Sequence, residues 1–431
     1  MIGREPGKPA MDRSTRLLIL AVFGLHMAFM PVLVLLLPRR MATLFDLHAA
    51  SALSWLLLGG ALTASVANIA AGLLGDRWAG RFGSRRSLIA IGLAALICSY
   101  GFLALAVELG WLILAIIAFQ IGLNLTLSPT MALLADHIAS SRKEAVAGRM
   151  GAALPFSTLA TTALGLAFPV DANGAFFATA VIVALCVSPL LVFWGFAPVT
   201  VSAPLRRSIP NRGKALSVRN LSLLWLARAL VQLAACFVLY YLFLHITSLI
   251  TGDTAWRDHS ATRVISVLSL ASAAIAMPAT VIGGRVSDGL RARQKGMAVA
   301  ALVMSLSLLV LASDLSPTLF GSAFIVFQLG LSVYLSVDTA FVAQLIGHHP
   351  RRGAIPGVLN LTNTLPAIFA PLLTLQTLRS ADRVLPYDLV YMACALGLVV
   401  SMVTVLRCRS DWANGKIVSP TRIPARRQPA P

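Results

Sequence analysis

The sequence has few charged residues, and acidic residues are scarcer still. Only 12% of its 431 residues are charged, with 16 Asp and Glu against 35 Lys and Arg, whereas 58% are hydrophobic. Soluble domains carry about 25% charged residues. This chain has too little charge to cover a water-facing surface, so we expect most of its surface to face lipid.

Several kinds of functional motif are also missing. The chain has no Gly-x-x-x-x-Gly-Lys phosphate loop, no nucleophile elbow and no cluster of metal ligands. Five cysteines show no metal-ligand spacing, and we expect free thiols at Cys98, Cys186, Cys236, Cys394 and Cys408. The sequence therefore predicts no enzyme, no cofactor and no bound metal.

Long apolar runs dominate what is present. A bilayer core about 30 Å thick needs roughly 20 apolar residues per helix. The sequence predicts an all-α membrane protein with twelve such helices, at about 17–37, 50–74, 87–107, 111–134, 147–169, 174–198, 221–249, 264–284, 297–313, 316–346, 354–378 and 389–406. The first is long and followed by Pro38-Arg39-Arg40, so we expect it to be retained rather than cleaved as a signal peptide.

Basic residues alternate in density between the two sides of these helices. With the amino terminus inside, the inner segments hold 28 of the 35 Lys and Arg, the outer loops hold six, and Arg228 lies within a helix. This positive-inside bias predicts a multi-pass protein of the plasma (cytoplasmic) membrane with both termini in the cytoplasm. It also explains the net charge of +19 without nucleic acid as a partner.

The chain divides at a polar, basic stretch near its middle. We predict a six-helix bundle at 1–199, a cytoplasmic linker at 200–220, a second six-helix bundle at 221–407 and a basic tail at 408–431. The halves echo each other: Gly72, Asp76 and Arg81 map onto Gly284, Asp288 and Arg293 at one offset, 284 − 72 = 212. Two pseudo-symmetric halves of this kind form transporters whose substrate site lies between them.

The loop after the second helix carries a family resemblance. It reads Gly72…Asp76-Arg77…Gly83-Ser84-Arg85-Arg86 and resembles the signature of the major facilitator superfamily. Together with Pro129…Asp136 and Tyr334-Leu-Ser-Val-Asp338, it looks like the glycoside–pentoside–hexuronide:cation symporters and the sucrose–proton carriers. The resemblance implies the major facilitator fold and alternating access.

The same resemblance implies inner gates. Asp76 would meet the start of the eleventh helix near Gly353, and Asp288 the start of the fifth near Ala147. Free N–H groups and the helix dipole favour a negative charge there. The expected gating residues are Gly72, Asp76, Arg77, Arg81, Arg85, Arg86, Gly284, Asp288 and Arg293. The alternative is that the arginines only set topology.

Charge inside the membrane is costly and indicates function by default. Arg228 and Asp338 each lie about 10–12 Å into their helices from the cytoplasmic side. We expect them to face each other, with Asp338 as a proton acceptor or, alternatively, as half of a fixed buried pair. His26, in the first helix, is a further candidate for coupling, against a purely hydrogen-bonding role.

Isolated polar residues interrupt the apolar helices and are candidates for substrate contact. The pairs Gln120/Asn124 and Tyr241/His245 each share one helix face, because their members are four residues apart. The expected substrate-binding residues are Gln120, Asn124, Gln232, Tyr241 and His245. The alternative is ordinary hydrogen bonding between helices.

These observations support three functional hypotheses. The first is a proton-coupled secondary transporter of a small polar solute, such as a sugar or glycoside. The second is an exporter of amphipathic or drug-like compounds, with a cavity lined by residues such as Met27, Phe29, Met30 and Phe237. The third is a membrane protein that does not transport and instead assembles with or binds a partner. We expect the bilayer, a small solute and the proton as partners of a monomer.

Overall fold

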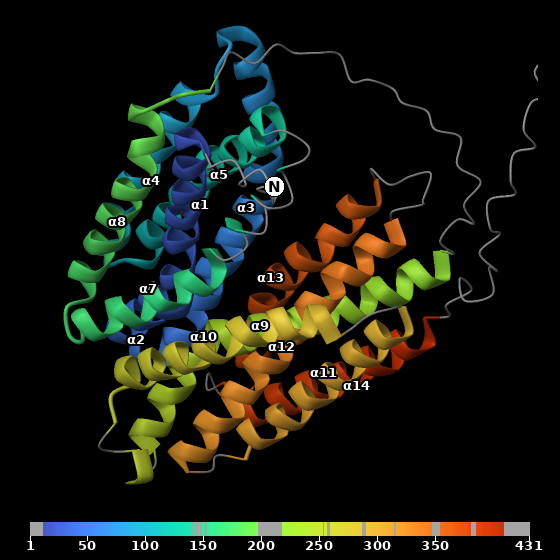
Figure 1. Ribbon diagram of the computed structural model, residues 1–431. Coiled ribbons are helices and arrows are strands. Elements are labelled where there is room, and N and C mark those ends of the chain that lie inside the picture. The colour runs from blue at the N-terminus through green and yellow to red at the C-terminus, as the bar shows by residue number, and fades with distance from the viewer. Residues whose placement is uncertain are drawn as a thin grey trace, which may run out of the picture.

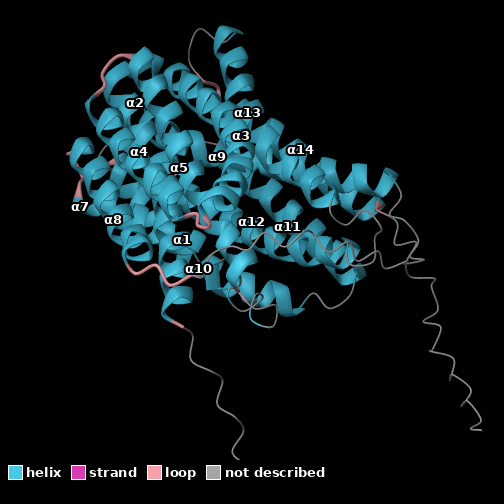
Figure 2. Ribbon diagram, turned by 90° about the horizontal axis from the view of Figure 1, so that it is seen from above, coloured by secondary structure: helices cyan, strands magenta, loops and turns pink. Residues whose placement is uncertain are grey.

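The computed structural model describes residues 12–138, 142, 146, 149–150, 153–196, 218–252, 254–256, 259–286, 290–313, 316–346, 354–380 and 385–408. These residues are almost entirely helical, and no strand occurs among them (Figure 2). Each of the twelve predicted apolar segments contains a helix, so the predicted all-α class is confirmed.

Six of these segments build the amino-terminal half. The first runs as a continuous rod through α1 (Arg13–Pro31), the π-helical turn η1 (Val32–Leu36) and α2 (Leu37–Phe45). The others are α3 (Ala49–Phe82), α4 (Arg86–Leu105), α5 (Leu109–His137), α7 (Ala153–Ala167) and α8 (Ala172–Val192). Gly83 ends α3 in the left-handed conformation, at φ 67°, which glycine adopts without strain.

The carboxyl-terminal half contains the other six segments. They are α9 (Val218–Gly252), α10 (Ala261–Val286), α11 (Leu290–Leu311), α12 (Pro317–Ile346), α13 (Ala354–Ser380) and α14 (Tyr387–Arg407). A short 3-10 turn (Thr254–Trp256) follows α9. Most of the predicted linker at 200–220 and nearly all of the tail at 408–431 lie outside the described residues, so the predicted domain boundaries stay a prediction.

The two halves form separate bundles that meet along two helix pairs. Within the first half α4 packs on α5 and α8, and within the second α11 packs on α12 and α14. Between the halves α3 packs on α13 and α7 on α10. The bundles converge near α2, α7 and α10 and diverge toward the end where the described chain begins (Figure 1).

The first helix extends beyond its predicted end at residue 37 because Arg39 and Arg40 are buried rather than exposed in a loop. Arg39 donates hydrogen bonds to the carbonyls of Phe168 and Pro169, just past the end of α7. Arg40 donates to the carbonyl of Ala106, just past α4, and to Asn173. Cations at helix carboxyl ends satisfy free carbonyls and complement the dipole. The two guanidiniums thus bond the first helix to the carboxyl ends of α4 and α7 and to the start of α8.

Apolar side chains on the outer surface indicate where lipid lies. Among the described residues, eight helical runs are long and apolar enough to span a membrane. Large apolar side chains such as Ile91, Phe102, Val181 and Leu185 are more than half exposed on α4 and α8. A contiguous exposed apolar surface of this kind is unfavourable in water and favourable in a bilayer.

Candidate functional site

A cavity of about 190 Å³ lies between the two halves. Residues of α1, η1, α2, α3 and α5 line it from one half, and residues of α9 and α13 from the other. Its walls are mostly aliphatic, and four polar side chains line it: Gln120, Tyr240, Asn363 and Thr364. Ligand sites are typically apolar clefts with a few placed polar groups.

Small residues on α3 make room for this cavity. Gly60, Ala61 and Ala64 line it where a larger side chain would project inward. A Cβ on Gly60 would lie 3.3 Å from Ile116 and 3.6 Å from the side-chain nitrogen of Gln120. The absence of side chains along this stretch of α3 therefore sets the cavity's size.

Arg228 and Asp338 contact each other, as their matching depths predict. Nη1 of Arg228 donates to Oδ2 of Asp338, and Nε of Arg228 donates to the hydroxyl of Thr362 at 3.1 Å. The Asp338 side chain is 3% exposed. Its second oxygen, Oδ1, is buried and has no hydrogen-bond partner among the described residues. A buried carboxylate that is only half satisfied is costly to keep ionised.

Two polar contacts between α9 and α13 lie one helix turn apart, one at this ion pair and one at the cavity. Asn363 lines the cavity and accepts a hydrogen bond from Gln232 at 3.0 Å. Gln232 lies four residues after Arg228 on α9, so the two share a helix face. Thr362, which binds Arg228, is next to Asn363 in the sequence. A shift of α13 at the cavity therefore moves both Thr362, which binds Arg228, and Asn363, which binds Gln232.

The other predicted substrate residues lie elsewhere. Asn124 is buried and accepts a hydrogen bond from Asn68 at 3.1 Å, which joins α5 to α3. Tyr241 bonds across the halves to Ser54 at 2.7 Å. His245 is enclosed by aromatic rings, stacked on Tyr387 with ring centroids 4.3 Å apart. Of the five predicted residues, only Gln120 is among those lining the cavity.

A close contact between α7 and α10 lies beside the Tyr241–Ser54 bond on the same, converging side of the bundles. The Thr162 hydroxyl donates to the carbonyl of Ser266 at 3.1 Å. A Cβ on Gly165 would lie 2.0 Å from the Ser266 hydroxyl, so any larger residue there would force Ser266 to move. These contacts hold α7 and α10 together across the two halves.

At the opposite end, Arg85 connects two acidic residues of the same half. It bonds Asp76 at 2.8 Å and Asp136 at 3.0 Å, and Gly75 leaves room for its guanidinium, since a Cβ there would lie 2.9 Å from Arg85 Nη1. The Asp76 side chain remains 73% exposed. No described residue of the other half covers it, and Gly353 lies outside the described residues.

The remaining predicted gating and coupling residues are placed as follows. Gly72 lies on α3 opposite Ser128, and Arg77, Arg81 and Arg86 are exposed. Gly284 is helical in α10, and Arg293 lies in the first turns of α11. Asp288 and Ala147 fall outside the described residues. His26 bonds through Nδ1 to the carbonyl of Val22 at 2.9 Å, within its own helix.

Sequence reasoning missed several residues that the structure brings to the site. Tyr240, not its neighbour Tyr241, lines the cavity, and Thr362 completes the Arg228 contacts. Adjacent helix positions differ by about 100°, so only tertiary packing decides which of two tyrosines faces inward. Among the described residues no group of three or more His, Cys, Asp or Glu side chains could hold a metal ion.

Comparisons with known proteins agree with this architecture. The family model of the Major Facilitator Superfamily matches residues 17–371. Among solved structures, a peptide transporter, POT, in complex with sulfate is similar at a TM-score of 0.71 and 14% identity, covering 94% of this chain and 96% of that one. The nucleoside transporter NupG is similar at a TM-score of 0.68 and 13% identity, covering 92% and 100%.

A third solved structure is a bacterial homolog of the human lysosomal transporter Spinster, in an inward-facing and unoccupied conformation. It is similar at a TM-score of 0.64 and 14% identity, covering 93% of this chain and 96% of that one. No curated protein sequence matches this chain. At these identities the structural likenesses establish the fold, and the family model establishes the lineage.

Proposed function

This chain belongs to the Major Facilitator Superfamily, and from that premise we propose that it is a proton-coupled secondary transporter of one small solute. As a membrane transporter of this fold, it works by exposing a site between its halves to one side of the membrane at a time. The proposal concerns the finer points: the coupling ion, the coupling residue and the class of solute.

The observation that carries the proposal is that α9 and α13 hold both the ion pair and the cavity wall. Arg228 bonds Thr362 and the buried Asp338, which keeps one unpartnered oxygen, and one helix turn along α9 Gln232 bonds Asn363 at the cavity. A buried carboxylate whose charge is only partly compensated is suited to accept a proton, because protonation removes that charge. Linking it to the solute cavity supplies the energetic coupling that transport needs.

The mechanism follows from the charges. A proton that binds Oδ1 of Asp338 removes the negative charge that holds Arg228. The guanidinium, which already bonds Thr362 through Nε, then gains freedom to move toward Gln232, one turn along α9. This alters the Gln232–Asn363 bond at the cavity wall, so proton binding and solute binding change each other's affinity by the same factor. The proton leaves to the other side when the halves rock.

The cavity lining favours an amphipathic solute. Leu33, Leu56, Ile116 and Phe29 offer an apolar wall, and the polar side chains gather on α5, α9 and α13. A solute with a polar end against Gln120 and Asn363 and an apolar body against the leucines satisfies both surfaces. Of the residues in the amphipathic-compound hypothesis only Phe29 lines the cavity, whereas Met27, Met30 and Phe237 do not.

A small sugar is the second candidate, because the cavity's volume of about 190 Å³ suits a small solute and lies below the roughly 300–1,000 Å³ of drug-sized sites. A sugar would need more hydrogen-bonding partners than this lining supplies. Assembly without transport is disfavoured, since a static scaffold has no use for an ion pair connected to a central cavity.

The sidedness of the state is part of the proposal. With both termini in the cytoplasm, the converging side with Tyr241–Ser54 and Thr162–Ser266 faces outward, and the exposed Asp76 faces the cytoplasm. The molecule is then open to the inside, and no described residue of the opposite half covers Asp76. We propose a monomer in the plasma membrane.

The test is ligand-dependent thermal stabilisation of the purified protein. A panel of sugars and of amphipathic compounds is measured at pH 5.5 and 7.5, since binding to the native state raises stability with ln(1 + [L]/Kd). We expect a pH-dependent shift with an amphipathic compound. The pH dependence should vanish in Asp338→Asn and persist in Asp388→Asn, which changes an exposed carboxylate on α14. Equal shifts at both pH values would contradict proton coupling.

A further inference from the structure

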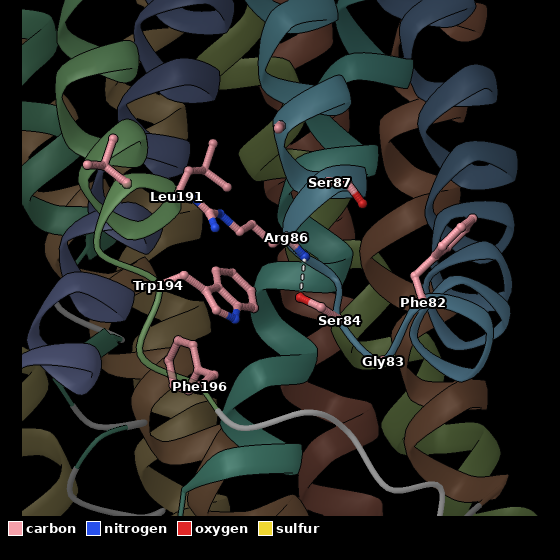
Figure 3. Close-up of a pocket in the computed structure, with 10 residues that line it drawn as sticks. Phe82, Gly83, Ser84, Arg86, Ser87, Leu191, Trp194 and Phe196 are labelled. Atoms are coloured by element: carbon pink, nitrogen blue, oxygen red, sulfur yellow. Dashed lines mark hydrogen bonds between the residues drawn. The ribbon is translucent and has the colours of Figure 1, made fainter.

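A second pocket, of about 650 Å³, lies outside the space between the halves. It is formed where the loop from α3 to α4 meets the end of α8, and Figure 3 shows Arg86 extending from α4 toward Leu191 of α8. Trp194 and Phe196, from the segment after α8, close the pocket on its other side (Figure 3). Its volume exceeds that of the central cavity.

The polar side of this pocket is basic. Arg86 is exposed, and among the described residues its guanidinium is bonded to no carboxylate. This separates it from Arg85, whose guanidinium is held by Asp76 and Asp136. Arg13 adds a second cation nearby, with its guanidinium carbon 4.0 Å from the ring centre of Phe193. Arg85 and Arg86 are adjacent in the sequence, yet Arg85 bonds two carboxylates whereas Arg86 lines this pocket.

Two hydroxyl groups, of Ser84 and Ser87, also line the pocket, and Figure 3 shows the Ser87 side chain pointing away from the Arg86 guanidinium. The Ser84 oxygen accepts a hydrogen bond from the Arg86 backbone N–H at 3.1 Å, and the Ser87 oxygen accepts one from Trp78 Nε1 at 2.8 Å. The Ser84 hydroxyl proton stays available to an incoming acceptor. Arginine and hydroxyl donors together are the usual partners of a phosphate group.

The other side of the pocket is apolar and continues along the lipid-facing surface. Ala90 of α4 and Leu191 and Val192 of α8 line it. Above them the exposed Ile91 and Leu185 extend the same apolar surface on the two helices. The pocket therefore offers a cationic, hydroxyl-lined end and an apolar end that opens onto the hydrocarbon region.

We propose that this pocket binds one anionic phospholipid of the cytoplasmic leaflet. The lipid phosphate bonds Arg86 and Ser84, the Trp194 ring lies at the headgroup level, and the acyl chains follow the apolar surface of α4 and α8. Basic pockets between membrane helices on the cytoplasmic side recognise anionic headgroups in this way, and tryptophan prefers the membrane interface. The site is independent of the central cavity and of any solute.

The test uses thermal unfolding of delipidated protein in a neutral detergent. The additions are phosphatidylglycerol, phosphatidylcholine and inorganic phosphate, each over a concentration series. We expect phosphatidylglycerol alone to raise the melting temperature of the wild-type protein and of Arg16→Gln, which removes an exposed arginine from the start of α1. Arg86→Gln should lose at least half of that shift.

A second variant, at another residue of the pocket, keeps the test decisive if Arg86→Gln misfolds. Ala90→Trp fills the pocket from an exposed position while leaving Arg86 intact, and it should also lose the shift. Native mass spectrometry should then find one retained phosphatidylglycerol in the wild-type protein and none in either pocket variant. A full shift in both variants, an equal shift with phosphatidylcholine, or an equal shift with inorganic phosphate would overturn the proposal. Because no transport is measured, failure of the proposed function would leave this result unaffected.

Discussion

Arg228 and Asp338 illustrate what a single buried charge costs in this molecule. Each is removed from solvent, and each is tolerated only because the other is present. Removing one partner of a buried pair typically destabilises a protein by about 3–5 kcal/mol, whereas replacing both partners is often far milder. The pair therefore makes a specific prediction for single and double substitutions.

Arg228→Gln should lower the melting temperature more than the double substitution Arg228→Gln/Asp338→Asn does. The single variant leaves a buried carboxylate with no cation, and the second change removes that carboxylate's charge. A double-mutant cycle on thermal unfolding measures the coupling, which should exceed the roughly 0.3–0.5 kcal/mol within which independent sites add. Additive effects would show that the two side chains act separately.

His137 gives the molecule a pH dependence outside the membrane-spanning segments. It lies at the end of α5, with its ring 4.8 Å from that of Phe196. Burial lowers the pKa of His137 below its usual value of 6.5, with Asp136 raising the pKa and Arg85 lowering it further. The His137 imidazole therefore binds a proton less well in the folded state than in the unfolded state.

Stability should fall as the pH drops below about 6.5 and should level off below the lowered pKa of His137 in the folded state. His137→Asn cannot take up the proton, so its loss of melting temperature between pH 7.5 and 5.5 should be smaller than that of the wild-type protein. His48→Asn changes a histidine in the turn between α2 and α3 and serves as the control. Identical pH profiles for wild-type protein and His137→Asn would contradict this account.

At the scale of helices, close packing between α7 and α10 holds the converging side shut. Gly165 permits this approach, because any side chain would strike Ser266. Gly101 on α4 provides a contrast, since a Cβ there meets nothing within 4 Å. The two glycines occupy similar helical settings and differ only in what faces them.

Gly165→Ala should weaken the closed contact, with a cost of about 1–3 kcal/mol for overpacking. Gly101→Ala should be neutral or slightly stabilising. The readout is alkylation of Ser54→Cys, in a background with exposed Cys98 replaced, by a reagent that cannot cross the membrane. Ser54 is fully buried here, so its labelling should become faster with Gly165→Ala and stay unchanged with Gly101→Ala. Unchanged labelling in both would mean that the contact does not control opening.

The elements themselves could be read from the sequence to a large extent. Apolar runs and turn residues located all twelve helical segments, because the bilayer imposes one length and one polarity on each. The first segment was predicted too short, since Arg39 and Arg40 look like loop residues until the carbonyls of Phe168 and Ala106 are in place. Matching depth was enough to pair Arg228 with Asp338. The sequence does not show how α9 is rotated about its own axis, so Tyr241 and His245 were predicted as substrate-binding residues, whereas Tyr240 lines the cavity.

At the scale of the whole molecule, two bundles joined along α3–α13 and α7–α10 can rock about those seams. The state described here is closed on the side of Tyr241 and Ser54, whereas Asp76 is exposed on the other. A transporter must also visit the reverse state. We propose that protonation of Asp338 biases the exchange between these two states.

The most direct test is the distance between spin labels at Arg16→Cys on α1 and Lys295→Cys on α11, at the ends of the two halves that diverge. Pulsed electron paramagnetic resonance at pH 5.5 and 8 should resolve a long and a short distance between the labels, and the populations of the two distances should change with pH. In Asp338→Asn the two distances should remain, with populations independent of pH. A single distance at both pH values, or an unaltered pH response in Asp338→Asn, would contradict the account.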